Sequence, residues 1–168
     1  IKIFLLLTLF LISCTTIPEG IKPINHFDVN RYIGKWYEIA RLDNRFERGL
    51  NKITAEYSFS DDGGLRVVNS GVNSESGIRE FAEGKAYCID KPDVGSLKVS
   101  FFGPFYGGYH IIDLDKENYS YAMIASSDKD YLWILARKPK LEGIVLQKLI
   151  DKAKQLGFNT PQLIYPEQ

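Results

Sequence analysis

The sequence predicts an all-β fold, an eight-stranded antiparallel up-and-down β-barrel with one C-terminal α-helix packed outside it. Two observations lead to this prediction. Eight runs with strand character follow one another between residues 35 and 137, and turn-forming residues rather than helical segments separate them. One segment with helical periodicity then follows the last run. Eight antiparallel neighbours joined by short turns close into a barrel, which has no unpaired sheet edge and an interior that can hold one small ligand.

The expected strands are recognised by apolar residues that alternate with polar ones. In the second run Ala55, Tyr57 and Phe59 share one face, and in the fifth run Val99 and Phe101 do the same. We expect these apolar sets to point into the barrel. The eight runs comprise residues 35–42, 52–60, 65–69, 78–89, 97–101, 109–114, 119–125 and 131–137.

The outer helix is expected over residues 141–156, and Gly157 ends it. Strands six and seven are apolar on both faces, so their phase is ambiguous, and an apolar outer face there needs the cover that a helix provides. The apolar residues at helical spacing are Val145, Leu149, Ala153 and Leu156.

Two smaller elements are expected at the ends of the barrel segment. A single helical turn within residues 27–32, capped by Asp28 or Asn30, precedes Gly34 and would plug one end of the barrel. Residues 163–165 would add a last short strand.

The composition fits one domain plus a leader. The chain has 168 residues, and its 21 basic and 21 acidic side chains balance, so no global field would attract nucleic acid. Cys14 and Cys88 are the two cysteines, too few for a disulfide framework or a zinc cluster. We therefore expect no metal site, no cofactor and no nucleic-acid partner.

The leader is expected to be a signal peptide over residues 1–13. Lys2 precedes an apolar stretch that is shorter than the roughly 20 residues a membrane-spanning helix needs. The run Leu11-Ile12-Ser13-Cys14 resembles a bacterial lipobox, which implies cleavage before Cys14, acylation of that residue and, with Thr15 next, transport to the outer membrane. The lipidated cysteine and a flexible tether would comprise residues 14–24 and the folded domain residues 25–168. The alternative is an ordinary signal peptide with a chance cysteine.

The up-and-down order brings three features to one end of the barrel. These are Gly34 and Trp36 at the start of the first strand, Asp115 in the turn after the sixth, and Arg137 at the end of the eighth. We expect Arg137 to lie over the indole of Trp36 as a cation–π pair, worth about 0.5 to 2 kcal/mol. This end would be closed and structural.

These residues resemble the motifs of the lipocalin family, specifically the bacterial outer-membrane lipocalins of the lipoprotein branch similar to apolipoprotein D. The run Gly34-Lys35-Trp36-Tyr37-Glu38 is similar to the first family motif, Asp115 to the aspartate of the second, and Arg137 to the arginine of the third. Leu114 and Lys116 depart from the second motif. The resemblance covers the mature chain and implies a calyx for fatty acids or lysophospholipids.

The other end of the barrel is expected to be the mouth. Its longest segment, residues 43–51, holds Arg45, Phe46 and Arg48. Apolar side chains beside arginines suit an amphiphile whose tail lies inside and whose anionic head lies at the rim. The alternative is a solvated loop in which Glu47 balances the two arginines.

A lipid-sized ligand fits the energetics. An acyl chain of about 15 methylenes, at ~0.8 kcal/mol each, would supply about 12 kcal/mol before the cost of association. The alternative is an outer-membrane lipoprotein with a structural or minor enzymatic role and a barrel filled by its own side chains. The expected lining residues are Ala40, Tyr57, Phe59, Val99, Phe101, Tyr109 and Trp133.

No enzyme is expected. His26 and His110 are the two histidines, the first lies in the region of the tether, just after residue 24, and no Gly-x-Ser-x-Gly elbow is present. Asp113 and Asp115 precede a turn, where aspartates are common. The function expected is a membrane-anchored carrier for lipid storage or transport in envelope maintenance. A monomer and a homodimer that shares its mouth both remain open.

Overall fold

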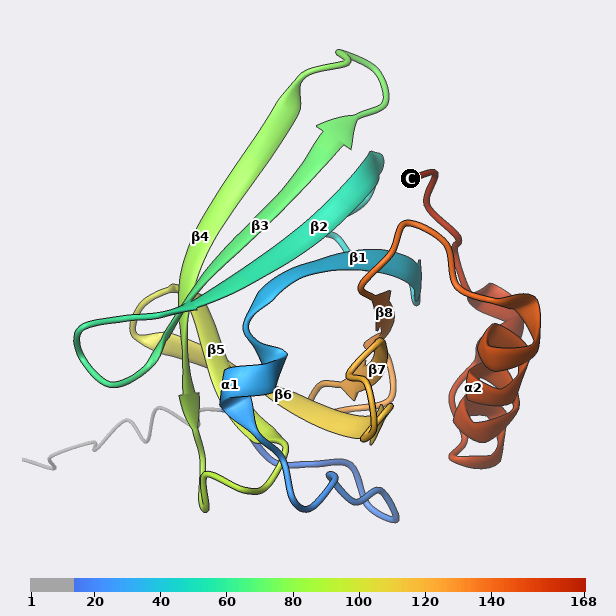
Figure 1. Cartoon of the computed structure of the whole chain (residues 1–168). Coiled ribbons are helices and arrows are strands. Elements are labelled where there is room, and N and C mark those ends of the chain that lie inside the picture. The colour runs from blue at the N-terminus through green and yellow to red at the C-terminus, as the bar shows by residue number, and fades with distance from the viewer. Residues whose placement is uncertain (1–13) are drawn as a thin grey trace, which may run out of the picture.

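The computed structural model describes residues 14–168, so the expected signal peptide at residues 1–13 lies outside the described part. The eight strands form one closed antiparallel barrel in the order of the sequence, and α2 lies beside it next to β7 and β8 (Figure 1). The elements are α1 (Val29–Tyr32), β1 (Gly34–Arg41), β2 (Leu50–Phe59), β3 (Leu65–Asn73), β4 (Arg79–Cys88), β5 (Ser96–Phe102), β6 (Phe105–Leu114), β7 (Tyr121–Ala125), β8 (Leu132–Ala136), α2 (Gly143–Gln155) and the 3-10 turn η1 (Thr160–Gln162).

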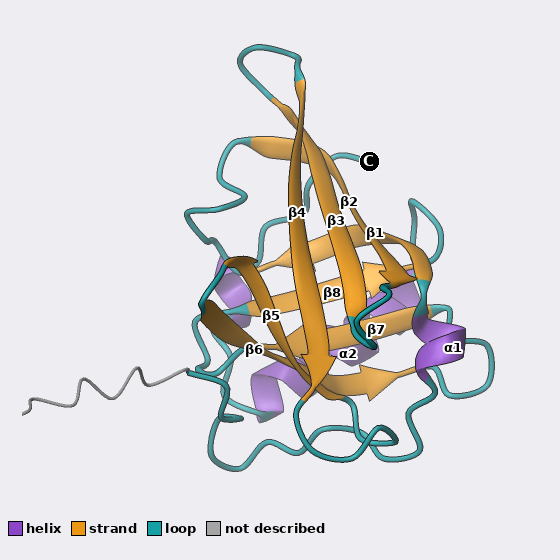
Figure 2. Cartoon of the chain, turned by 90° about the vertical axis from the view of Figure 1, so that its left-hand side faces the viewer, coloured by secondary structure: helices purple, strands orange, loops and turns teal. Residues whose placement is uncertain are grey.

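The predicted fold class is confirmed, and the strand ends differ where hairpins are tighter than expected. Phe102 pairs with Phe105, so only Gly103 and Pro104 join β5 to β6, and β6 begins four residues earlier than the alternation indicated. β3 and β4 remain paired as far as Val72 and Arg79. Their hairpin stands out beyond the rest of the barrel (Figures 1 and 2).

Two apolar clusters occupy the two faces of the barrel wall. The inner cluster includes Trp36, Tyr57 and Ile111, whereas the outer one joins Met123 on β7 to Leu149 on α2. The two-faced apolar character of β6 and β7 thus has the predicted cause, which is that α2 covers their outer face. The Lys152 ammonium adds a polar tie because it donates to the carboxylate of Asp113 at 2.6 Å and to the Ile112 carbonyl at 3.0 Å.

A β-bulge in β1 changes which side chains face inward. The register with β8 shifts between Glu38 and Ala40, so two consecutive residues face outward there and every later residue reverses its face. Ala40 and Leu42 belong to the outer cluster under α2, whereas Arg41 stands opposite Trp133. The expectation that Ala40 lines the interior is therefore wrong.

The segment expected to be a flexible tether, residues 14–24, instead packs along the barrel. Ile21 is a buried member of the outer cluster, and Ile17 packs against that cluster. Both apolar side chains are thereby removed from water. The Ile24 amide donates to the Ile111 carbonyl at 2.9 Å. Residues 14–24 are therefore held against the barrel by hydrogen bonds and apolar contacts.

The C-terminal segment fills a gap where β1 and β2 diverge. Their pairing ends at Tyr37 and Thr54, and beyond that point the backbones of Arg41 and Ile164 exchange two hydrogen bonds. The short strand expected at residues 163–165 is thus reduced to a single bridge. The Gln168 side chain spans the gap by donating to the carbonyls of Glu38 and Ile53.

Candidate ligand site within the barrel

The closed end is built around the predicted pair of Trp36 and Arg137. The Trp36 side chain is fully buried, its ring centroid lies 3.9 Å from the Arg137 guanidinium carbon, and its Nε1 donates to the Tyr32 carbonyl at 2.8 Å. Desolvation lowers the pKa of Arg137 below its usual range. The guanidinium donates to five backbone carbonyls, those of Arg31, Tyr32, Ile33, Lys35 and Tyr119.

Gly34 and Asp115 support this end in different ways. Gly34 has φ +97°, and a Cβ there would lie 3.4 Å from Arg137 Nη1, so glycine serves both the backbone conformation and the close approach. The Asp115 carboxylate accepts hydrogen bonds within its own turn, including one from the Ser120 hydroxyl at 2.5 Å. It thereby shapes the turn whose Tyr119 carbonyl reaches Arg137.

Three tyrosine hydroxyls meet inside the barrel next to the closed end. Tyr109 lies 2.7 Å from Tyr32 and accepts from Tyr57 at 2.8 Å. Desolvation raises the pKa of all three phenols, Tyr57 among them, so they remain neutral. The three hydroxyls bond to one another, and the rings belong to the inner cluster or pack against it.

A buried polar network lies in the half of the barrel nearer the mouth. Arg41 and Glu38 are each 3% exposed at the side chain and pair at 2.9 Å. Arg41 Nη2 donates to the Glu47 carbonyl, and the Glu47 carboxylate accepts from Trp133 Nε1 at 2.9 Å and from the Asn44 amide at 2.5 Å. The first mouth loop is thus fastened to the interior through Glu47.

This network holds one guanidinium and two carboxyl groups. Desolvation raises the pKa of Glu38 well above its usual 4.5, and the charge of Glu47 and a hydrogen bond with it raise the pKa further, whereas Arg41 acts in the opposite sense. A neutral Glu38 removes one buried negative charge from this network, and burial favours that state. Arg41 Nε is buried and has no hydrogen-bond partner among the described residues.

The structure brings together most of the side chains expected to line the ligand space. Phe59, by contrast, is 54% exposed at the end of β2, and Ala40 lies outside the wall as described above. Five of the seven belong to the inner cluster or pack against it: Tyr57, Val99, Phe101, Tyr109 and Trp133.

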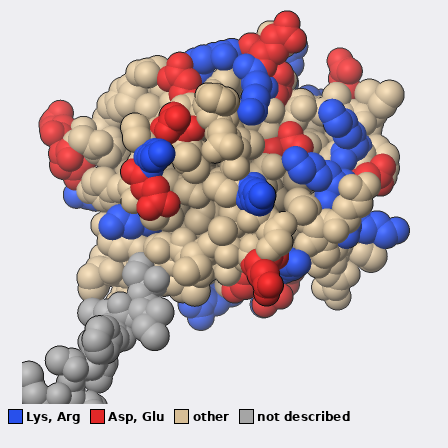
Figure 3. All heavy atoms as spheres, turned by 90° about the horizontal axis from the view of Figure 1, so that it is seen from below, with Lys and Arg blue, Asp and Glu red and all other residues tan. Residues whose placement is uncertain are grey.

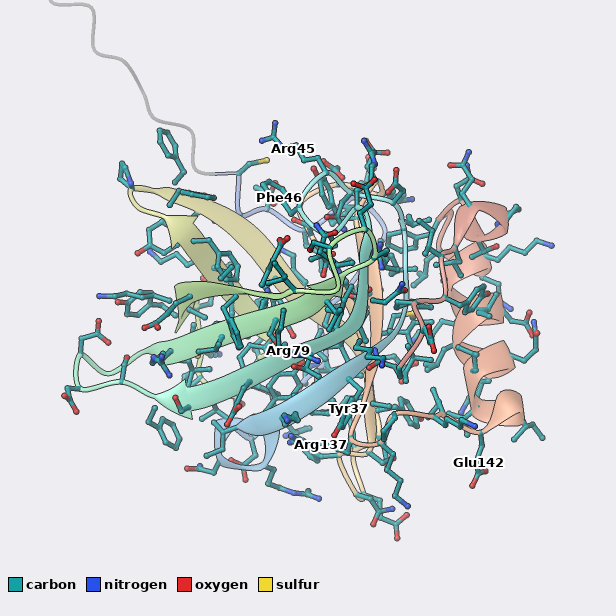
Figure 4. All side chains as sticks on the ribbon, turned by 90° about the horizontal axis from the view of Figure 1, so that it is seen from above. Tyr37, Arg45, Phe46, Arg79, Arg137 and Glu142 are labelled. Carbon is teal, nitrogen blue, oxygen red and sulfur yellow. The ribbon has the colours of Figure 1, made fainter. Side chains whose placement is uncertain are left out.

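The two rim arginines have local partners. Arg48 pairs with Asp43 at 2.6 Å on the surface, and Arg45 stacks over Phe46 at 4.9 Å. Glu47 does not balance them, as the solvated-loop alternative assumed, because its carboxylate turns inward to Trp133. Figure 4 shows Arg45 and Phe46 at one end of the barrel and Arg137 at the other.

Sequence reasoning missed Arg41, Asn44 and Glu47 as interior groups. Strict alternation in the first strand puts Arg41 on the outer face, and only the bulge turns it inward. The adjacent apolar pair Ile39 and Ala40, which breaks the alternation, is the one signal that was available.

Two further findings concern metal binding and membrane-spanning helices. Among residues 14–168, no three His, Cys, Asp or Glu side chains gather where they would hold a metal ion. No helix in the described chain is both long and apolar enough to cross a membrane.

A closed eight-stranded barrel with a helix beside it, plugged by an arginine over a tryptophan, defines a lipocalin. The Lipocalin-like domain family matches residues 27–168, and the chain belongs to the lipocalin family. Insecticyanin from the tobacco hornworm Manduca sexta has the same fold, with a TM-score of 0.69 and 25% identity over 92% of this chain and 87% of that one.

Bacterial relatives match over nearly the whole chain. It is 50% identical to the outer membrane lipoprotein Blc of Vibrio cholerae, over 99% of this chain and 98% of that protein. It is 51% identical to the protein of the same name from Escherichia coli K12, over 93% and 88%. Apolipoprotein D of Mus musculus is more distant, at 31% identity over 85% and 78%.

Proposed function

We propose that this chain is a membrane-anchored carrier that holds a fatty acid or a lysophospholipid inside the barrel, for lipid storage or transport in envelope maintenance. It acts by binding rather than by catalysis. The names of its bacterial relatives, which are outer membrane lipoproteins, support an outer-membrane location. We place the chain on the periplasmic side, with acylated Cys14 as the anchor. A second copy of the chain, as a homodimer, stays a prediction.

The observation that carries the proposal is the buried guanidinium of Arg41. It stands opposite Trp133, which packs against the apolar inner cluster, and its Nε has no partner within the described residues. A carboxylate or phosphate is the group that a guanidinium binds best, through charge-assisted hydrogen bonds. A lipid with its tail over the tyrosine triad would contact the apolar inner cluster, and its head group would accept a hydrogen bond from Arg41.

The alternative is a barrel filled by its own side chains, with a structural role for the lipoprotein. It is favoured by the closed half, where Trp36, Tyr32 and Tyr57 are each at most 4% exposed. A mass spectrum of lipids extracted from natively purified protein separates the two functions. The carrier predicts a stoichiometric amphiphile, and the filled barrel predicts none.

The binding itself is tested by displacement of a fluorescent fatty acid from delipidated protein. We expect saturable binding with one site per chain, and no saturable binding would defeat the carrier. Trp133→Ala should weaken the affinity about tenfold, equal to about 1.4 kcal/mol. Phe59→Ala is the matched control, because Phe59 is an exposed aromatic at the closed end and should leave the affinity unchanged.

The role of Arg41 is tested by comparing two ligands of the same chain length. Arg41→Met should weaken the binding of lauric acid about tenfold and that of dodecanol much less, because only the acid carries the charge that the guanidinium would meet. Equal weakening of both ligands would mean that Arg41 acts on the shape of the barrel rather than on the head group.

A further inference from the structure

Residues 164–168, which we call the C-terminal strap, lie between β1 and β2 where these two strands are no longer paired with each other. The strap exchanges two backbone hydrogen bonds with Arg41 on β1, and the Lys52 amide on β2 donates to the Glu167 carbonyl at 2.6 Å. In Figure 1 the end of the chain, marked C, lies next to the start of β2. The strap thus closes the barrel wall at a place where the two neighbouring strands leave it open.

The opening beneath the strap is as wide as one strand. Arg41 and Lys52 both bond to the strap and not to each other, so their backbones lie two strand spacings apart, which is about 10 Å. An extended acyl chain is no wider than an extended peptide, because its carbons carry only hydrogen atoms. Without the strap, the wall would therefore admit the tail of a fatty acid.

The inner side of this opening is part of the ligand site. The backbones of Glu38 and Arg41 bond to the strap, while their side chains form the buried ion pair described above. The Gln168 side chain spans the opening, because its Nε2 donates to the Glu38 carbonyl at 2.6 Å and to the Ile53 carbonyl at 3.0 Å. A molecule that entered beneath the strap would therefore meet the Arg41 guanidinium.

The outer side of the opening borders a hollow that is lined by cations. The hollow lies on the outer face of β1 to β4, has a volume of about 390 Å³, and includes Gln168 in its wall. Its charged side chains are Lys35, Lys52, Arg79 and one acid, Glu56. None of the three cations forms an ion pair with another residue of the described chain. Figure 4 shows Arg79 over the first strands of the barrel.

Arg79 is oriented by its neighbours in the hollow. Its Nη1 donates to the Ser70 hydroxyl at 2.9 Å and to the Lys52 carbonyl at 3.3 Å, whereas its Nη2 has no hydrogen-bond partner within residues 14–168. The face of the molecule seen from below has basic and acidic side chains interspersed (Figure 3), so unpaired cations are not a general feature of this surface. A carboxylate is a group that such a guanidinium binds through charge-assisted hydrogen bonds.

The strap itself has the features of a segment that opens locally. Hydrogen bonds hold it, while the side chains of Tyr165 and Glu167 are exposed and that of Pro166 is buried. Lys52, its partner on β2, has φ +50°, a left-handed conformation that is unfavourable for lysine. Segments with few buried apolar contacts open without unfolding of the whole domain.

We propose that the strap covers a side entrance of the barrel, through which a fatty acid exchanges between solution and the ligand space. The cations of the hollow hold the carboxylate outside the wall while the tail passes beneath the open strap toward the tyrosine triad. The carboxylate then follows to Arg41, and the strap closes behind it. This route rests on the proposed function, because it requires that the chain binds a fatty acid.

The entrance is tested by the rates of uptake and release of a fluorescent fatty acid with a free carboxylate, measured by stopped flow on delipidated full chain. The double variant Asn51→Ala with Gln168→Ala removes the side chains that hold the strap to β2 and span the opening. Both rate constants should rise about tenfold at unchanged equilibrium affinity, because the open strap becomes more populated. Tyr165→Ala, an exposed side chain of the same strap, is the matched control and should change neither rate.

The role of the hollow is tested with two ligands of the same chain length. The double variant Lys52→Gln with Arg79→Gln should slow the association of lauric acid about fivefold and leave that of dodecanol unchanged, because only the acid carries a charge. Arg66→Gln is the matched control, since Arg66 is an exposed arginine of β3 that pairs with Glu83 at 2.6 Å. Equal slowing of both ligands, or equal slowing in the control, would contradict the role of the hollow.

The side entrance and the proposed function fail in different ways. Unchanged exchange rates in the strap variant, at wild-type affinity, would mean that the ligand uses the mouth, and the carrier function would stand without the side entrance. No saturable binding to the wild-type chain would defeat both.

Hydrogen exchange of the wild-type chain measures the opening without any substitution. The amides of Lys52 and Ile164, which bond across the opening, should exchange about a hundredfold faster than the amides in the paired part of β1 and β2. Exchange of both sets at the rate of global unfolding would show that the strap does not open, and would overturn the proposal.

Discussion

The two ends of the barrel each hold an arginine, and the two arginines are satisfied in opposite ways. Arg137 at the closed end donates to five backbone carbonyls and lies on an indole, all of them neutral partners. Arg41 near the mouth pairs with Glu38, and its Nε has no partner among the described residues. The polar atoms of Arg137 thus bind only backbone, whereas Arg41 keeps one buried donor without a partner in this part of the chain.

The two ends should also differ in how their stability depends on pH. Neutral carbonyl acceptors do not titrate, so the closed end should be insensitive to pH in the physiological range. The mouth network contains Glu38, whose pKa burial raises, and Arg41 links Glu38 to Glu47 in the loop that borders the entrance. We therefore expect stability to reside at the closed end and sensitivity to ligand and pH at the mouth.

The largest expected effect comes from Trp36→Ala at the closed end. It removes a fully buried indole and the surface on which Arg137 lies, and should lower the free energy of unfolding by about 3 to 5 kcal/mol. Urea denaturation followed by circular dichroism measures this change. Trp133→Ala should cost less stability because Trp133 is only partly buried, and an unchanged midpoint for Trp36→Ala would contradict the closed-end assignment.

Arg137→Met should come next, with a loss of about 2 to 3 kcal/mol. The methionine keeps apolar contact with the indole but removes the guanidinium donor from five carbonyls, of which the Tyr32 carbonyl alone is known to keep another, Trp36 Nε1. The same denaturation experiment applies. Arg137→Lys should lie between wild type and Arg137→Met, since it keeps the charge with fewer donors. A loss equal in both variants would show that the carbonyl contacts matter little.

The closed end was largely predictable from the sequence, and the mouth was not. Gly34, Trp36 and Arg137 each stand at a strand end, where chain order alone decides which elements meet. The interior of the mouth half depends on a bulge of one residue in β1, which reverses Ala40 and Arg41 between the faces. The alternation of polar and apolar residues cannot locate such a bulge. With or without the bulge, β1 has apolar residues on both of its faces.

The variant Glu38→Gln tests the pH dependence of stability in the mouth half of the barrel. Because the folded state raises the pKa of Glu38 above 4.5, its contribution to stability is complete below pH 4.5 and is lost as the pH rises through the higher folded pKa. Wild-type stability should fall over that window by about 1.4 kcal/mol per pH unit relative to the glutamine variant. Glutamine keeps the shape and carries no proton to lose.

The check is urea denaturation of both chains at a series of pH values from 4 upward. The two curves of stability against pH should meet near pH 4 and separate as the pH rises, with Glu38→Gln the more stable. Parallel curves would show that the folded state does not raise the pKa of Glu38.

The smallest effect is expected from Asp115→Asn, and its pH dependence has the opposite sign. Burial raises the pKa of Asp115, but hydrogen bonds from Ser120, Asn118 and Glu117 outweigh it and hold the pKa below 3.8. Its contribution is therefore present above pH 3.8 and is lost as the pH falls through the folded pKa. At neutral pH the variant should lose about 1 kcal/mol, because asparagine keeps one acceptor oxygen and replaces the other with a donor that faces the Ser120 amide.

Glu117→Gln in the same turn is the matched control, since the backbone of Glu117 makes the turn contacts, and it should leave stability unchanged. The deficit of Asp115→Asn should shrink as the pH is lowered below 3.8, where the wild-type carboxylate is itself protonated. A deficit that is constant down to pH 2 would mean that the shape of the turn, not the charge of Asp115, stabilises the carbonyl that Tyr119 presents to Arg137. The charge of Asp115 would then contribute nothing to the stability of the closed end.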